Sequence, residues 1–333
     1  MTPLPAGYAL RPFRDADYPG LAALQLAIYA DFATPEDEQR RDDALKPAFV
    51  RRARFVVEDA ATGQVIATAE YSQEAGRYEP GRFGVFVDVL PGHEGRGIGG
   101  AAWDHLMAEL ARHEPAVLET YVREENARGL DFAGRRGLLE ARRVFPSDAD
   151  LASFDLSPWA GLEDRLREKH GVVIRTVGDL EGDPERGPKL HALCEAIRAD
   201  FPSDAPATAQ SYDAWVERFW DEPLLVKDAY HVAVAPDGVT YIGYNNLGRD
   251  EEEPGRLWTK QTGVLREWRQ KGIATALKVR GMAWAKEHGY KTVRTFNDSA
   301  NAPMLAVNER LGFRRLPAWI YLKKVLKEEE SPS

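Results

Sequence analysis

The sequence lacks long hydrophobic runs and paired cysteines, and each absence excludes a class of protein. No stretch of the 333 residues approaches the roughly 20 consecutive apolar residues of a membrane-spanning helix. The N-terminal region carries Arg11, Arg14, Asp15 and Asp17 where a secretory signal would be apolar. The single cysteine, Cys194, has no partner for an intrachain disulfide and is expected to be a small buried residue. These features predict a cytoplasmic protein that is not associated with a membrane.

An excess of basic charge and metal-ligand spacing are also missing. The formal net charge of -9 argues against a broad basic face, so we expect no nucleic-acid partner. His93 and His231 lack neighbours at metal-ligand spacing, so we expect no metal site. What the sequence does have is a globular composition, with 44% hydrophobic and 29% charged residues, and about twice the length of one domain.

The order of the periodic segments predicts the fold class. In the first half, residues 65–71 and 83–90 alternate as strands do, a glycine-rich turn follows, and residues 100–113 have helical apolar spacing. A strand at 117–122 and a helix that starts near Asn126 and stops at Gly137 follow, and the second half repeats this order. We therefore predict an α/β (α+β) fold in which each half is a mixed, mostly antiparallel twisted sheet flanked by helices.

The repeat has a fixed offset. Three pairs of residues are each separated by 175 positions: Gly97 and Gly272, Asn126 and Asn301, and Gly137 and Gly312. One offset shared by three pairs is hard to obtain by chance, and it indicates a tandem pair of domains. We predict an N-terminal domain at residues 1–157, a connecting helix at 158–171, a C-terminal domain at 172–327 and a polar tail at 328–333.

The repeated turn has the chemistry of a phosphate cradle. A strand that ends in a glycine-rich turn and opens a helix presents several backbone N–H groups to one point, and the helix dipole attracts anions there. Small residues let a pyrophosphate approach these amides, and nearby basic side chains add charge. The candidates are Gly95, Arg96, Gly97, Ile98 and Gly99 in the first half, and Arg269, Gln270, Lys271, Gly272, Ile273 and Ala274 in the second.

Two other interpretations of the turn compete with this one. Gly95, Gly97 and Gly100 also fit the dinucleotide pattern G-x-G-x-x-G, with Glu119 about 20 residues further on. The second turn lacks this glycine spacing, which argues against a nicotinamide or flavin cofactor. A single glycine turn between a strand and a helix can also be plain structure, but its repetition at one offset favours a ligand site.

The turns resemble the central motif of the GNAT superfamily of N-acetyltransferases, which is Gln/Arg-x-x-Gly-x-Gly/Ala after the fourth strand. Arg269, Gly272 and Ala274 match this motif in full, whereas Glu94 stands at its first position in the N-terminal copy. The family also places an asparagine before the next helix, as at Asn301. Since an arginine attracts phosphate and a glutamate repels it, we expect the second turn to bind CoA more tightly.

This resemblance implies an acyl-CoA-dependent N-acyltransferase, with acetyl-CoA as co-substrate, that transfers the acyl group directly to the amine of a small molecule. It implies that the pantetheine arm pairs with the fourth strand like an added strand. It places CoA contacts at Val87, Val89 and Asn126 in the first half and at Thr262, Val264 and Asn301 in the second. Both asparagines also suit helix N-caps. Two fused domains can mimic a dimer, so the sequence is consistent with a monomer.

Candidates for the acid and the base are few. The resemblance implies a tyrosine acid four residues before each closing glycine, but Ala133 and Asn308 stand there, and Asn308 is retained as a candidate. Asp88 on the fourth strand and Glu70 on the third are candidate bases in the first half, where Asp88 could also be an ordinary solvated carboxylate. Gly263 matches Asp88 in the second half. The missing tyrosines leave open an alternative function, in which a GNAT-like protein binds CoA or a partner without catalysis.

Overall fold

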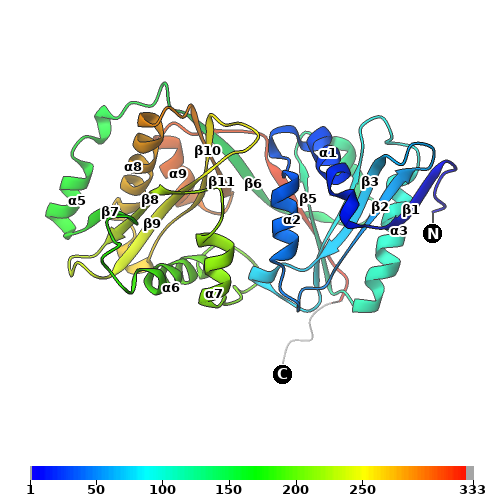
Figure 1. The fold of residues 1–333 in the computed structure, drawn as a ribbon, viewed down its shortest axis with the longest axis horizontal. Helices are drawn as coiled ribbons and strands as arrows, with labels where there is room; N and C mark the ends of the chain where they lie inside the picture. Colours follow the sequence, from blue (N-terminus) through cyan, green and yellow to red (C-terminus); the bar gives the residue numbers. More distant parts are fainter. Residues whose placement is uncertain (1, 328–333) are drawn as a thin grey trace. The chain divides into compact units, whose positions relative to one another are not determined.

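The computed structural model describes residues 2–327, which form two compact units (Figure 1). Unit 1 contains the chain up to Ala141 together with the segment that starts at Ile320. Unit 2 contains Arg142–Trp319. The predicted polar tail at 328–333 lies outside the described residues.

Unit 1 is a mixed sheet with helices beside it. Its strand order is β1 (Tyr8–Pro12), β2 (Arg52–Asp59), β3 (Val65–Ser72), β4 (Arg82–Val89), β5 (Val117–Arg123) and β13 (Trp319–Val325). Strands β1 to β4 pair antiparallel, whereas β4 and β5 pair parallel. The helices are α1 (Tyr18–Tyr29), α2 (Glu36–Ala44), α3 (Ile98–Leu110) and α4 (Ala127–Gly134). Fully buried Ile66, Phe83 and Leu106 belong to the core that joins sheet and helices.

Unit 2 repeats this arrangement. Its strand order is β6 (Leu139–Asp150), β11 (Thr292–Asp298), β10 (Arg256–Val264), β9 (Tyr241–Arg249), β8 (Leu225–Val234) and β7 (Val173–Thr176), and the short β12 (Arg314–Arg315) also pairs with β6. Strands β10 and β11 are parallel, and the other pairs are antiparallel. The helices are α5 (Leu162–His170), α6 (Arg186–Ala199), α7 (Tyr212–Trp215), α8 (Ile273–Glu287) and α9 (Ala302–Arg310). The predicted fold class is confirmed in both units.

The unit boundaries differ from the predicted ones. The last strand of each sequence half is exchanged, so β13 from Ile320 onward completes unit 1, and β6 from Arg142 onward completes unit 2. The segment predicted as a connecting helix is part of unit 2, because Leu166 of α5 is buried in a cluster with Ile174 and Leu277. Strand pairing satisfies backbone groups wherever the partner strand lies in the sequence, and local patterns do not reveal that partner.

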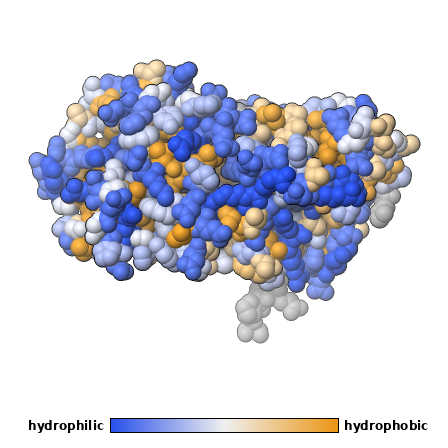
Figure 2. All heavy atoms as spheres, in the orientation of Figure 1, coloured by the Kyte–Doolittle hydropathy of each residue, from blue (hydrophilic) through white to orange (hydrophobic). Residues whose placement is uncertain are grey.

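The surface is predominantly hydrophilic on the face shown in Figure 2, as the content of charged residues requires. Among residues 2–327, no helix is both long enough and apolar enough to cross a membrane.

Candidate active site

Each unit has a turn with the same backbone geometry between its fourth strand and the following helix. Gly97 (φ 87) precedes α3 and Gly272 (φ 83) precedes α8 as N-caps in the left-handed region, where only glycine is unstrained. Two residues earlier, Gly95 (φ 74) and Gln270 (φ 62) are also left-handed. A Cβ added to Gly272 would meet no atom within 4 Å, so an anion has open access to the start of α8.

The charges around the first turn are paired within unit 1. The Glu94 carboxylate lies 3.2 Å from Arg128 Nη1, so its repulsion toward a phosphate is partly offset. Arg96 donates to the carbonyl of Gly92 (2.7 Å) and to the hydroxyl of Tyr8 (3.0 Å). Pro5 would lie 3.9 Å from a Cβ at Gly97, so this turn is less open than the second one.

The second turn is more basic. Arg269 donates through Nε to the carbonyl of Val264 (2.9 Å), and its Nη2 lies 2.5 Å from the Asp200 carboxylate. Asp200 also pairs with Arg266, so one carboxylate faces two guanidinium groups. Lys271 donates to the backbone carbonyl of Glu267, and no carboxylate in the described part of the chain forms an ion pair with it. These contacts leave an excess of positive charge beside the helix N-terminus, as binding of a pyrophosphate requires.

The parallel strands in each unit separate toward the turn. Strands β4 and β5 are paired through Arg82, Phe83 and Gly84. Strands β10 and β11 are likewise paired from Arg256 to Trp258. Beyond these residues the edge of the fourth strand that faces the fifth has no partner strand among residues 2–327, so its backbone groups can pair with a ligand.

The predicted pantetheine contacts lie in these separated regions. Val87 and Val89 follow the last paired residue of β4, and Thr262 and Val264 follow that of β10. Ile98 and Gly99 open α3, and Ile273 and Ala274 open α8. Their contacts with CoA stay predictions.

The asparagines before the next helices are N-caps, as predicted. Asn126 Oδ1 accepts from the backbone N–H of Gly129 at 2.8 Å, and Asn301 Oδ1 accepts from that of Met304 at 3.3 Å. Each cap satisfies one of the free N–H groups at a helix start. A contact of either asparagine with CoA stays a prediction.

In unit 1, the separated end of β4 carries a perturbed carboxylate. The Tyr29 hydroxyl, at the end of α1, donates to Asp88 Oδ1 at 2.5 Å. Asp88 is partly exposed, and loss of hydration raises its pKa to about 6, although the hydrogen bond from Tyr29 opposes this rise and the charge of Glu70 adds to it. A carboxyl group with this pKa is ionised at neutral pH and can also be protonated readily.

Glu70, the other candidate base of the first half, is engaged in ion pairs. It forms an ion pair with Arg54 Nε, and its other oxygen lies 3.7 Å from Lys46 Nζ. Arg54 also pairs with Asp43 at 2.9 Å. Glu70 is thus held by two cations, whereas Asp88 accepts a hydrogen bond from a neutral hydroxyl, and the role of either residue as a base stays a prediction.

The position in unit 2 that matches Asp88 has no room for a side chain. A Cβ at Gly263 would approach Ile197 Cγ2 to within 2.2 Å, so Ile197 of α6 fills that space. Asn308 is 3% exposed, and its Nδ2 donates to Asn297 Oδ1, while its own Oδ1 has no hydrogen-bond partner. Cys194 is buried, as predicted, and burial raises the pKa of its thiol. The site in unit 2 therefore contains neither a carboxylate at the matching position nor a reactive thiol.

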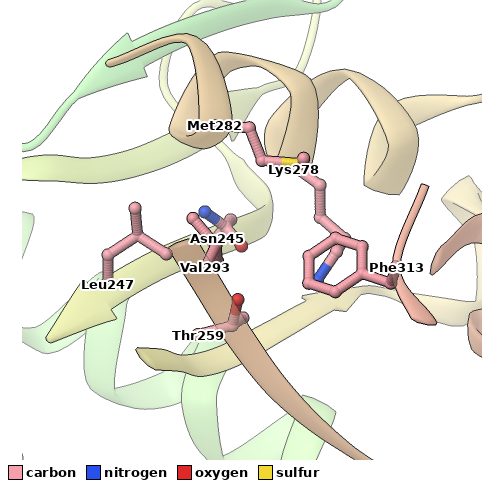
Figure 3. A pocket seen from close by; sticks show the side chains of 7 residues that line it. All are labelled: Asn245, Leu247, Thr259, Lys278, Met282, Val293 and Phe313. Atoms are coloured by element: carbon pink, nitrogen blue, oxygen red, sulfur yellow. The ribbon is translucent and has the colours of Figure 1, made fainter. Parts of the chain in front are cut away.

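Unit 2 also contains a buried lysine that the sequence did not indicate. Lys278 of α8 is 3% exposed and lines a small pocket with the residues shown in Figure 3: Asn245, Leu247, Thr259, Met282, Val293 and Phe313. Its Nζ lies 4.9 Å from the centroid of the Phe313 ring, and no carboxylate within residues 2–327 pairs with it. Burial lowers its pKa to about 7.

Sequence reasoning missed Tyr29 and Lys278 for different reasons. Tyr29 lies 59 positions from Asp88, and no motif connects the two. Lys278 lies in the middle of α8, and a lysine in a helix ordinarily lies on the exposed face. A separate question is whether the structure could hold a metal ion. Residues 2–327 contain no group of three or more His, Cys, Asp or Glu side chains that could hold one.

Two glycine turns at helix starts, each beside a pair of separating parallel strands, define the class of this protein. The chain belongs to the acetyltransferase (GNAT) family, whose model matches residues 21–138 and 190–313, and it is an N-acetyltransferase by class. The two matches confirm the tandem arrangement.

Individual proteins of this family resemble the chain in sequence or in structure. The chain is 26% identical over 265 residues to a mycothiol acetyltransferase of Pseudarthrobacter chlorophenolicus, and the match covers 77% of this chain and 74% of that protein. It is 26% identical over 287 residues to the mycothiol acetyltransferase of Clavibacter sepedonicus, covering 84% and 86%. Among solved structures, it resembles a tandem GNAT protein from the clavulanic acid biosynthesis pathway (TM-score 0.73, 20% identity, 97% and 100% covered). A GCN5-related N-acetyltransferase from Sphaerobacter thermophilus gives a TM-score of 0.68 at 20% identity, with 98% of each chain covered. The structural likenesses show the fold.

Proposed function

We propose that this chain transfers the acetyl group of acetyl-CoA directly to the amine of a small molecule, and that the transfer takes place in unit 1. The observation that carries this proposal is the pair of Tyr29 and Asp88 at the separated end of β4. A proton acceptor beside the unpaired strand edge is where an acyl-transfer reaction needs one. The relatives named mycothiol acetyltransferase support acetyl as the group transferred.

The residues of unit 1 suit the parts of such a reaction. The N–H groups at the start of α3, from Gly97 to Gly99, would hold the pyrophosphate, and the edge of β4 from Val87 to Val89 would pair with the pantetheine. The thioester supplies an activated acetyl carbon when it is bound. Asp88 takes a proton from the acceptor ammonium, so that the neutral amine forms the C–N bond while the C–S bond breaks, and the leaving thiolate takes the second proton, which the nitrogen releases as the amide forms. The hydrogen bond from Tyr29 keeps the Asp88 carboxylate oriented.

For unit 2 we propose binding of acyl-CoA without transfer. Its turn matches the family motif, is the more basic of the two and is open at Gly272. Ile197 fills the place where unit 1 has its carboxylate. The non-catalytic function that the missing tyrosines suggest is therefore assigned to one unit rather than to the whole chain.

Binding by unit 2 can be tested with a bulky residue at its turn. Gly272→Trp is expected to abolish the tighter of two acetyl-CoA sites, with at least a roughly 100-fold loss of affinity, because the side chain would cover the amides that hold the phosphates. Isothermal titration of the intact protein measures this loss. Gly289→Trp is the matched control, since Gly289 has nearly the same φ (80 against 83) and open space around it. An unchanged tight site in Gly272→Trp would contradict the assignment.

The same variant also tests which of the two units carries out acetyl transfer. Gly272→Trp is expected to retain acetyl transfer, whereas Gly97→Trp is expected to lose it, because transfer is proposed for unit 1. Release of the CoA thiol in the presence of a panel of amines measures transfer. If no amine raises thiol release above hydrolysis while CoA still binds, the non-catalytic alternative applies to the whole chain.

The rate is expected to depend on pH through Asp88. Since the Asp88 pKa is about 6, kcat/KM falls about tenfold per pH unit below that value, because the base is then protonated. The acceptor amine titrates as well, so the ratio of wild-type to Asp88→Asn rates isolates this effect. The ratio should rise through pH 6 and level off above pH 7. A ratio that stays constant from pH 5 to pH 8 would exclude Asp88 as the base.

A further inference from the structure

The face of unit 1 that carries Asp88 also carries a row of aromatic rings. Phe86 lies two residues before Asp88 on β4, so both side chains project from the same face of the sheet. The Phe86 and Tyr121 ring centroids are 4.9 Å apart, and those of Tyr121 and Tyr321 are 5.5 Å apart. We call these three residues, on β4, β5 and β13, the aromatic row.

The aromatic row lies on the face opposite α3. Phe55 packs its ring against His105 of α3, and Val89 lies beside Gly99, so the alternate residues face that helix. Asp88 contacts Tyr29 of α1 instead. An acceptor that reaches Asp88 from the α1 side therefore meets the aromatic row. Tyr121 is 40% exposed, so a ligand can reach its ring.

Two arginines on the face that carries the aromatic row are engaged in ion pairs. Arg54 pairs with both Glu70 and Asp43. Arg82 pairs with Glu79 and Glu119. A polyhydroxylated acceptor such as a sugar would have to break these pairs to gain hydrogen bonds from Arg54 or Arg82, whereas a flat apolar ring gains aromatic contacts and leaves the pairs intact.

We infer that the acceptor in unit 1 is a primary amine joined to an aromatic ring by a short alkyl chain, with the ring on the aromatic row and the ammonium group at Asp88. This inference rests on the proposed function of unit 1. A short linker follows from the place of Tyr121, the middle ring of the aromatic row: loss of hydration raises the pKa of its phenol, and Asp88 lies near enough for its charge to raise that pKa further. The Phe86 ring lies over Gly84, on the side away from Asp88. Two or three carbon atoms between nitrogen and ring let the ring contact Tyr121 while the ammonium is in hydrogen-bond contact with the carboxylate.

Matched amines test the inference. Phenethylamine is expected to have a KM at least roughly tenfold lower than n-propylamine or glucosamine, since each aromatic contact adds a modest free energy. Tyr121→Ala should raise the KM for phenethylamine roughly tenfold more than the KM for n-propylamine. Tyr121→Phe, which keeps the ring, should retain the preference for phenethylamine over n-propylamine. Equal KM values for the three amines, or equal effects of Tyr121→Ala on phenethylamine and n-propylamine, would overturn the inference.

Direct binding distinguishes this inference from the proposed function. Isothermal titration of the protein with each amine, without acetyl-CoA, requires no turnover. If phenethylamine binds and Tyr121→Ala weakens it while no amine is acetylated, the site stands and the transfer proposal fails. If amines are acetylated without preference for a ring, the transfer proposal stands and the inferred acceptor class is wrong.

Discussion

Replacing Asp88 with asparagine is expected to lower kcat for acetyl transfer by about 100- to 10,000-fold, the usual contribution of a general base. Asparagine has the same shape and can still accept the hydrogen bond from Tyr29, but it cannot take a proton from the acceptor. The affinity for acetyl-CoA should stay unchanged, because the substitution alters only the side chain of Asp88 and keeps the β4 backbone that is proposed to pair with the pantetheine. Steady-state kinetics together with isothermal titration of acetyl-CoA give both quantities.

Tyr29→Phe is a milder change that tests the same role of Asp88. It removes the hydroxyl that donates to Asp88, and this hydrogen bond lowers the Asp88 pKa. The pH at which kcat/KM levels off should therefore move upward, while much of the activity at pH 8 is retained.

Transfer that is unaffected in Asp88→Asn but lost in Gly272→Trp would place the reaction in unit 2 and refute the assignment to unit 1.

Lys278→Met is expected to stabilise unit 2 by about 5 kcal/mol below pH 7, because each tenfold change in the proton-binding constant corresponds to 1.36 kcal/mol. The folded state lowers the lysine pKa from 10.5 to about 7, since the side chain is buried without a counter-ion. Methionine has a similar volume and contacts the Phe313 ring favourably, so it removes the cost of burying the charge and keeps the packing. Urea denaturation followed by tryptophan fluorescence measures the change. Every tryptophan except Trp103 lies in unit 2.

The sign of the pH dependence follows from proton binding. Between about pH 7 and pH 10.5 the unfolded lysine holds a proton that the folded one has lost, so wild-type stability rises with pH across this window. Below pH 7 both states are protonated and this contribution is constant. Lys278→Met should lack the rise, and Lys169→Met, an exposed lysine on α5, should change stability by less than about 0.5 kcal/mol. Equal stability of Lys278→Met and wild type at pH 6 would show that the buried ammonium group has little cost.

The phosphate-binding turns could be predicted because their requirements are local. A strand that ends in a left-handed residue before a helix needs glycine at that position, so Gly97 and Gly272 stand out in the sequence. Asn126 and Asn301 were predictable as N-caps for the same reason, since each side chain bonds a backbone group three residues away. Repetition at one offset then distinguished these residues from isolated turn signals.

The chemistry beside the turns could not be predicted in the same way. Asp88 was a candidate from its place on β4, but its hydrogen bond with Tyr29 depends on how α1 packs across the sheet. Glu70 was an equal candidate, and the ion pairs with Arg54 and Lys46 set it apart. The contrast between units was also hidden, because Gly263 can be recognised as crowded only when Ile197 is seen beside it.

The sequence by itself determined the tandem family fold, the two turns and their helix caps, because backbone conformation and capping depend on residues within a few positions of one another. The tertiary structure decided the exchange of β6 and β13, the difference between the two sites and the burial of Lys278. These features depend on contacts between residues that are distant in the chain. A hydrogen bond, a filled space or the loss of water around a charge exists only after the elements have packed together.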